Sequence, residues 1–103
     1  LYRLLNELSD RSAEQWPRTR MAKLAGMSVS TLTRQFRRAT GYAPNEYLQR
    51  LRLKKSTMLL LNPELSISEI AERTGFSDSN YFCRQFRARY NVSPQKYRKS
   101  REV

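Results

Sequence analysis

An internal repeat constrains the fold of this 103-residue chain more than any other feature. The segment Arg34-Gln35-Phe36-Arg37 recurs letter for letter as Arg84-Gln85-Phe86-Arg87, and Pro44 and Tyr47 recur as Pro94 and Tyr97 at the same offset of 50 residues. Upstream the offset is 49, which aligns Gly26 with Gly75 and Ser28 with Ser77. A repeat that keeps a turn glycine, a serine, an aromatic residue and an arginine together is hard to reach by chance, so we expect both copies to share one task.

The second copy predicts two helices joined by a tight turn. Ser66 and Glu69 fit a capping box that opens a short helix, and Gly75 can adopt the left-handed conformation that ends it. Ser77 is then expected to cap a helix over about residues 78–90, with an aromatic side that anchors and an arginine side that stays free. So tight a turn forces a steep crossing, which is the helix-turn-helix arrangement; an ordinary helical hairpin is the alternative.

The first copy repeats this pattern over about residues 28–40. Gly26 closes a short helix, Ser28 is expected to cap the next one, and Gly41 ends it. Pro17 occupies the position of Ser66, so the first copy lacks the capping box. The helix is expected to bury one side, formed by Val29, Leu32, Phe36 and Ala39.

The rest of the chain also predicts helices, so the expected fold is all-α. Leucines at helical spacing open the chain, and a connecting helix is expected over residues 44–61 between subdomains at 1–43 and 62–103. After Ser93-Pro94 we expect a short helix and then a frayed basic tail over Arg98 to Arg101. The apolar residues of the connecting helix are expected to pack against both subdomains: Tyr47, Leu48, Leu51, Met58 and Leu59. Its cationic residues are expected to stay mostly solvated: Arg50, Arg52, Lys54 and Lys55.

Charge narrows the classes of partner. The net charge is +11, and both predicted helices after the turns lie in tracts with almost no acidic residue. Such a field favours polyanions, with nucleic acid ahead of membrane surfaces and acidic proteins. No segment has the length of a transmembrane helix or the form of a signal peptide, and the single cysteine, Cys83, cannot form an internal disulfide. We therefore expect a cytoplasmic protein that does not enter membranes.

The residue inventory argues against an enzyme. The chain has no histidine, one cysteine and no glycine-rich phosphate loop, so histidine-dependent catalysis and the common metal sites are absent, and no cofactor or metal is expected. A nonspecific nucleoid or RNA-binding protein is the remaining alternative. Duplicated helix-turn-helix units favour sequence-specific duplex DNA, because the deep major groove of RNA excludes a helix.

A set of motifs at fixed spacing covers nearly the whole chain. It comprises Gly26-Met27-Ser28, Leu32, Arg34, Phe36, Gly41, Pro44, Tyr47-Leu48, Arg52, Leu59-Leu60, Ile67, Glu69-Ile70-Ala71, Gly75-Phe76-Ser77-Asp78, Tyr81-Phe82, Arg84-Gln85-Phe86, Pro94 and Tyr97-Arg98. Together these motifs resemble the DNA-binding domain of the AraC/XylS family of bacterial transcription regulators.

The resemblance implies seven helices, with two helix-turn-helix units joined by a long helix. It implies that both recognition helices enter neighbouring major-groove segments of promoter DNA, and that the domain activates or represses transcription, with RNA polymerase as a partner. It also implies a preceding effector-binding or dimerisation domain, and a start without an initiator methionine agrees with a fragment. Ser56 departs from a usual alanine, which changes little.

The base-contacting positions implied by the resemblance are Ser30, Thr33, Arg34, Ser79, Asn80, Cys83 and Arg84. Arginine can bind guanine bidentately and asparagine can bind adenine, but Arg34 and Arg84 could instead contact phosphate or solvent, and Asn80 could serve capping. Ser30 and Thr33 can contact either base or phosphate. Cys83 departs from the polar residue usual in the family and is expected to be an inert thiol. Four arginines further along the helices are expected to bind phosphate, with plain surface charge as the alternative: Arg37, Arg38, Arg87 and Arg89.

Overall fold

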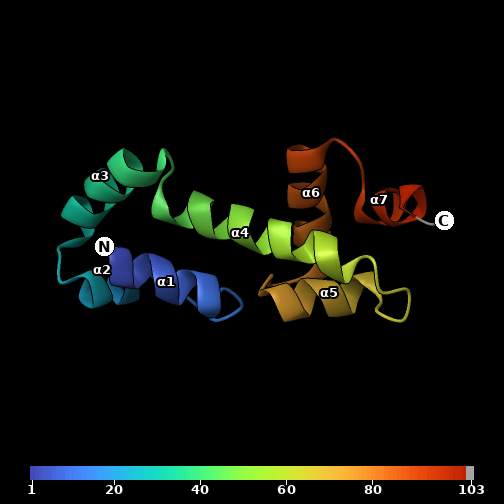
Figure 1. Ribbon diagram of the computed structural model, residues 1–103, viewed down its shortest axis with the longest axis horizontal. Helices are drawn as coiled ribbons and strands as arrows, with labels where there is room; N and C mark the ends of the chain where they lie inside the picture. The colour runs from blue at the N-terminus through green and yellow to red at the C-terminus, as the bar shows by residue number, and fades with distance from the viewer. Residues whose placement is uncertain (102–103) are drawn as a thin grey trace. The chain divides into compact units, whose positions relative to one another are not determined.

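A computed structural model describes residues 1–101, and within this range the chain forms seven α-helices and no strand (Figure 1). The helices are α1 (Tyr2–Asp10), α2 (Arg18–Ala25), α3 (Val29–Thr40), α4 (Pro44–Leu59), α5 (Ile67–Thr74), α6 (Ser79–Tyr90) and α7 (Pro94–Ser100). The predicted all-α class and helix number are confirmed. The chain divides into two compact units, unit 1 (Leu1–Leu51) and unit 2 (Arg52–Val103), and the boundary falls inside α4.

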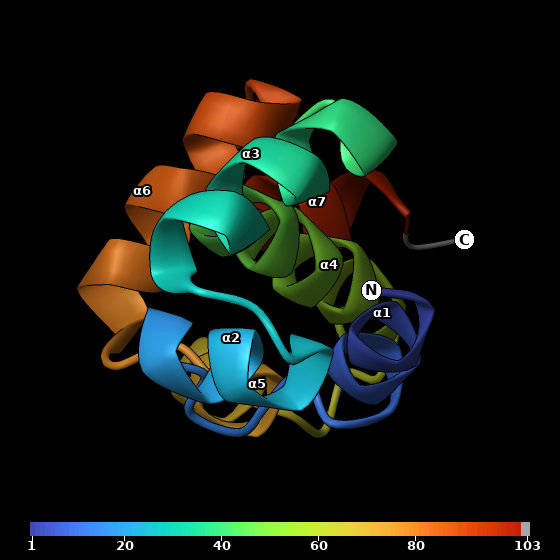
Figure 2. The ribbon, with the colours of Figure 1, turned by 90° about the vertical axis from the view of Figure 1, so that its left-hand side faces the viewer.

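Unit 1 is built around an aliphatic core. Leucine and methionine side chains from α1, α2, α3 and the start of α4 surround Phe36, which lies edge-on to Tyr47 with ring centroids 5.2 Å apart. Figure 2 shows α3 above α2, joined by the short turn. The buried members of this core are Leu4, Leu8, Trp16, Met21, Ala22, Leu32, Phe36 and Leu48.

Unit 2 has a core rich in aromatic rings. Phe86 lies in contact with three of them, at centroid distances of 5.8 Å to Phe82, 4.7 Å to Tyr90 and 5.5 Å to Tyr97. Figure 1 shows α6 standing steeply on α5, as a helix-turn-helix requires. The buried members of this core are Leu53, Leu60, Leu65, Ile70, Ala71, Phe76, Phe82 and Phe86.

The local signals at the helix ends are mostly confirmed. Gly26 and Gly75 adopt left-handed conformations, with φ of 68° and 99°, and end α2 and α5. Ser66 and Glu69 form the predicted capping box, with both reciprocal hydrogen bonds present. Ser28 caps α3 by accepting a hydrogen bond from the backbone amide of Thr31 at 3.2 Å. These ends satisfy backbone groups that would otherwise lack partners.

The predicted cap of the second recognition helix was wrong by one residue. Asp78, not Ser77, precedes the first helical residue, and its Oδ1 accepts a hydrogen bond from the amide of Tyr81 at 2.7 Å. Ser77 is therefore the extra residue in the turn of the second copy. The offset of 50 begins at the cap itself, where Asp78 corresponds to Ser28.

The connecting helix is shorter than predicted. It ends at Leu59 rather than Leu61, because the amides of Leu61 and Asn62 bond carbonyls only three residues earlier, at 3.2 and 3.0 Å, and so tighten the chain into a turn. Met58 does not pack into a core, since its side chain is 69% exposed. The spacing of apolar residues along α4 predicted that Met58 is buried. Burial also requires a neighbouring element on that side of the helix, which the spacing does not reveal.

Arg52 is buried, contrary to the expectation of a solvated cation. Burial lowers the pKa of its guanidinium, and the charge of Tyr81 acts in the opposite direction. Nearby Ser56 is fully buried, and its hydroxyl donates to the carbonyl of Leu53 at 2.5 Å. This bond lets α4 bury a serine without leaving its hydroxyl unsatisfied.

The predicted frayed tail is also wrong. Helix α7 continues to Ser100, and the guanidinium of Arg98 donates hydrogen bonds to three backbone carbonyls. The acceptors are Leu60 at 2.9 Å, Asn62 at 3.1 Å and Leu65 at 2.7 Å. Arg98 thereby ties α7 to the loop between α4 and α5, a role that a run of basic letters in the sequence does not reveal.

Candidate nucleic-acid interface

Helix α3 presents a polar and cationic side away from the core of unit 1. Leu32 and Phe36 are fully buried, and on the opposite side of the helix Ser30, Arg34 and Arg37 are exposed to solvent. Two residues expected in the core lie outside it: Ala39 is exposed, as is Val29, whose side chain is 36% exposed. They stand near the two ends of α3, and the core covers only its middle turns.

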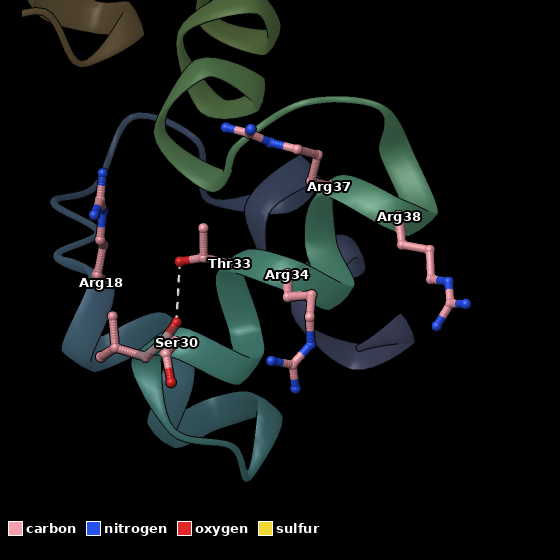
Figure 3. A pocket seen from close by; sticks show the side chains of 7 residues that line it. Arg18, Ser30, Thr33, Arg34, Arg37 and Arg38 are labelled. Carbon is pink, nitrogen blue, oxygen red and sulfur yellow. Dashed lines mark hydrogen bonds between the residues drawn. The ribbon is translucent and has the colours of Figure 1, made fainter.

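The exposed side of α3 borders an open concavity of about 1060 Å³ on the surface of unit 1 (Figure 3). We refer to it as the α3 concavity. Five of its lining residues were predicted to contact DNA, and the structure brings them together on one surface. The lining consists of Arg18 from α2 and Val29, Ser30, Thr33, Arg34, Arg37 and Arg38 from α3.

The α3 concavity carries positive charge without an acidic neighbour in its lining. Among residues 1–101, no ion pair engages Arg34, Arg37 or Arg38. Figure 3 shows the three side chains extending from α3 in different directions, with Arg18 on the opposite flank. Uncompensated guanidinium groups that surround small hydroxyl side chains suit a ligand with several negative groups.

Hydroxyl groups on the same surface are partly committed to the helix itself. Thr33 Oγ1 donates to the carbonyl of Val29 at 3.0 Å, the dashed bond in Figure 3. Ser30 Oγ lies 3.4 Å from Ser28 Oγ at the cap. The hydroxyl hydrogen of Thr33 is therefore not available to a ligand while this bond persists.

Helix α6 offers a comparable side in unit 2. Phe82 and Phe86 are fully buried, whereas Asn80, Arg84 and Arg87 are exposed. The alternative of a capping role for Asn80 is not realised, because Asp78 supplies the cap acceptor. Further along, the guanidinium of Arg89 lies over the ring of Tyr90, 5.1 Å from its centroid. The exposed polar groups of α6 thus face solvent from a helix that the aromatic core holds in place.

Ser79 and Cys83 of α6 are only partly exposed. Cys83 packs against the core of unit 2, and this burial raises the pKa of its thiol. The thiol is therefore protonated at neutral pH and is a poor nucleophile.

Comparison with known proteins identifies the family. A family model described as a helix-turn-helix domain matches residues 21–100. The chain is 42% identical over 99 residues to the HTH-type transcriptional activator RhaS of Escherichia coli O139:H28 (strain E24377A / ETEC), with 96% of the chain and 36% of the relative covered. A crystal structure of an AraC-type transcriptional regulator from Chromobacterium violaceum superposes with a TM-score of 0.88 at 28% identity, covering 98% of this chain and 90% of the other. The chain belongs to the AraC-type helix-turn-helix family.

A second similar solved structure contains DNA. The DNA-binding domain of AdpA, a global transcriptional factor crystallised with a target DNA, matches with a TM-score of 0.90 and 31% identity, covering 94% of this chain and 87% of the other. The chain spans about a third of the length of the curated relatives it matches.

Two lining residues of this AraC-type domain were not predicted as site residues. Arg18 aligns in the repeat with Ile67, and Val29 aligns with Ser79. In each pair, one copy has a polar residue where the other has an apolar residue. A comparison of the two copies could have used this difference in polarity to identify Arg18 and Val29 as site residues. Within residues 1–101, no group of three or more His, Cys, Asp or Glu side chains is placed to hold a metal ion, and no helix there is long and apolar enough to cross a membrane.

Proposed function

We propose that this AraC-type domain binds double-stranded DNA sequence-specifically, with α3 and α6 each inserted into the major groove. The α3 concavity is the observation that carries the proposal, because it combines an exposed helix face, small polar groups and four arginines in one place. A B-DNA major groove admits one α-helix and lies between two rows of phosphates. AdpA, crystallised with a target DNA, has the same fold, which supports this reading.

The side chains divide into two roles by their position. Arg34 and Arg84 each stand near the middle of the exposed side of their helix and would bind guanine O6 and N7. The other residues proposed to reach base edges are Ser30 and Thr33 in α3 and Ser79, Asn80 and Cys83 in α6. Residues further along the helices would contact phosphates at the groove walls: Arg37, Arg38, Arg87 and Arg89. Arg18 joins this second group, since the first helix of such a unit crosses the DNA backbone.

Duplex DNA is a better ligand than RNA for this surface. The major groove of A-form RNA is too narrow and deep for side chains on a helix to read, and sequence-specific RNA recognition relies largely on stacking of bases on exposed rings. The phenylalanines of the two recognition helices are fully buried in the cores of their units. The surface therefore offers cations and hydroxyl groups rather than stacking platforms.

We propose that this chain is the DNA-binding domain of a longer, cytoplasmic transcription activator, and that the domain is a binding module rather than an enzyme. RhaS is a transcriptional activator, and this chain matches about a third of the length of RhaS. By the same reasoning, an effector-binding or dimerisation domain would precede this one, and RNA polymerase would be its protein partner at the promoter.

Selection of bound duplexes from a random library tests the proposal. We expect one enriched motif with two parts. The logarithm of the affinity for it should fall linearly with the logarithm of the salt concentration, with a slope of about −0.9 for each phosphate neutralised. Equal recovery of all sequences would leave nonspecific binding as the function. A lack of salt dependence would contradict phosphate contact altogether.

Variants of three arginines separate base from phosphate contacts. Arg34→Ala and Arg84→Ala should each relax preference in one part of the motif and cost about 1–3 kcal/mol if the contact is bidentate. Arg38→Ala is the matched control on α3, and it should weaken all sequences alike. If Arg34→Ala instead lowers affinity for every duplex equally, Arg34 contacts phosphate and its assignment to base reading is wrong.

A further inference from the structure

We propose that α3 recognises the C5-methyl group of thymine through an apolar spot formed by Val29 and Thr33. The proposal rests on the proposed function and deepens it, because it names the chemical group that one half of the DNA site must present. It also assigns a specificity role to Val29.

Val29 is an apolar residue in the polar and cationic lining of the α3 concavity. It is the first residue of α3, its side chain is 36% exposed, and the other residues that line the α3 concavity are four arginines and two hydroxyl residues. An isopropyl group offers no hydrogen bond to a phosphate or to a polar base edge. In the major groove, the apolar group that distinguishes one base pair from another is the thymine methyl.

Thr33 extends this apolar spot. Residues four apart lie on the same side of a helix, so Val29 and Thr33 are neighbours along α3. The hydroxyl of Thr33 donates to the carbonyl of Val29 at 3.0 Å. Since that hydrogen is bound to the helix, the hydroxyl of Thr33 can only accept a hydrogen bond from a base, and thymine O4 and N7 of a purine have none to donate. The methyl group of Thr33 stays free for apolar contact, and threonine methyl groups contact the thymine methyl in the major groove.

The same recognition is not built into α6. The residues that correspond to Val29 and Thr33 are Ser79 and Cys83. Serine has no methyl group, and Cys83 packs against the core of unit 2. The two halves of the DNA site should therefore differ: a thymine methyl contributes in the half read by α3 and not in the half read by α6.

Replacement of thymine by deoxyuridine tests this at the level of one methyl group. The duplex from the selection is used as the probe, and the Arg34→Ala and Arg84→Ala variants assign its two halves. Each thymine is then replaced singly by deoxyuridine. We expect a loss of about fourfold at one or more positions in the α3 half, the factor that corresponds to burying one apolar carbon, and no loss in the α6 half.

Protein variants show whether Val29 and Thr33 are responsible. Val29→Ser, which introduces the residue found in α6, should markedly reduce the difference in affinity between the thymine and deoxyuridine duplexes. Thr33→Ser keeps the hydroxyl but removes the methyl and should reduce the difference between the two duplexes. Ser79→Ala in α6 is the matched control and should leave the difference intact. Circular dichroism should show unchanged helix content, since Val29 and Thr33 are not part of the core.

The outcomes separate this proposal from the function on which it rests. If the selected motif binds specifically but tolerates deoxyuridine at every position of the α3 half, or contains no thymine there, methyl recognition is wrong and the DNA-binding function stands. Retention of the full methyl effect in Val29→Ser would likewise overturn the role of Val29. If selection enriches no motif, both proposals fail together.

Discussion

Units 1 and 2 carry the same helix-turn-helix repeat but stabilise it by different means. In unit 1, Phe36 shares a core with leucine and methionine side chains, and within residues 1–101 its ring pairs with the ring of Tyr47. In unit 2, Phe86 occupies the same place in the repeat and contacts three rings. The repeat therefore specifies where a large apolar side chain must sit, but it leaves open what surrounds that side chain.

The loops before the two repeats differ in the same way. In unit 1, Trp16 Nε1 donates to the carbonyl of Arg11 at 2.9 Å, a bond made within the loop itself. In unit 2, Arg98 reaches from α7 to three carbonyls of the corresponding loop. The residue of unit 1 that matches Arg98 is Leu48, which is buried in the core. One position of the repeat thus serves packing in one unit and loop attachment in the other.

The largest difference should appear when the central phenylalanine is removed. Phe→Ala in a core costs about 3–5 kcal/mol, and each aromatic pair adds about 0.5–1.5 kcal/mol. Phe86→Ala should therefore destabilise unit 2 more than Phe36→Ala destabilises unit 1. Chemical denaturation followed by circular dichroism measures the loss, and Trp16, the single tryptophan of the chain, reports unit 1 by fluorescence.

Milder variants keep this comparison measurable if the alanine variants do not fold. Phe86→Leu and Phe36→Leu remove the rings but retain apolar volume, so the excess loss at Phe86 should persist while both losses shrink. Equal losses from the two leucine variants would show that the ring cluster of unit 2 adds nothing beyond apolar burial.

The next largest effect is expected at Arg98. Arg98→Leu introduces the residue that unit 1 carries at this position, and it removes hydrogen bonds from a charged donor, each worth about 1.5–3 kcal/mol. We expect a destabilisation of unit 2 within that range in total, because water can reach some of the freed carbonyls. Lys99→Ala is the control, since Lys99 is exposed on the same helix. An Arg98→Leu variant as stable as the parent would mean that the loop holds its shape without α7.

Much of this fold could be predicted from the sequence because its signals are local. Glycines at positive φ, the Ser66 and Glu69 capping box and the buried Phe36 each follow from a few neighbouring residues. The resemblance carried by the spaced motifs gave the number of helices. Such signals show where a helix begins, where it ends and which side is apolar.

The wrong predictions concern burial or exposure of single residues, which depends on the element that packs opposite each of them. Periodicity assigned Val29 and Met58 to a core, but Val29 is 36% exposed and Met58 is 69% exposed. Because arginine is charged, Arg52 and Arg98 were expected to be solvated. Arg52 is instead buried, and Arg98 donates hydrogen bonds to backbone carbonyls distant in the sequence. At the interface, the arginines of α3 were predictable, whereas Arg18 required knowledge that α2 borders the same concavity.

The helix caps offer a finer comparison of the two copies. Ser28→Ala and Asp78→Ala each remove a side-chain acceptor and should cost about 1 kcal/mol. Ser77→Ala should cost close to nothing, because Ser77 precedes the cap rather than forming it. Thermal unfolding by circular dichroism measures all three. A loss at Ser77 equal to that at Asp78 would restore the alignment of Ser28 with Ser77 and contradict the one drawn from the structure.

The smallest effect is expected at Arg18, where the copies differ in a residue that faces the α3 concavity rather than a core. Arg18→Leu imitates the apolar Ile67 of unit 2 while keeping the helix propensity of arginine. It should weaken binding to all duplexes by a few-fold and reduce the salt slope by about 0.9, the value for one phosphate contact.

Stability should move in the opposite direction in the same variant. Arg18 is the first residue of α2, and a cation there opposes the helix dipole by about 0.3–1 kcal/mol. Removal of the charge should therefore leave unit 1 equally stable or slightly more stable, as Trp16 fluorescence during denaturation would show. Weaker binding together with undiminished stability identifies Arg18 as a contact to DNA. A loss of both would instead make Arg18 a structural residue of unit 1, and the contrast with Ile67 would then concern the fold rather than the ligand.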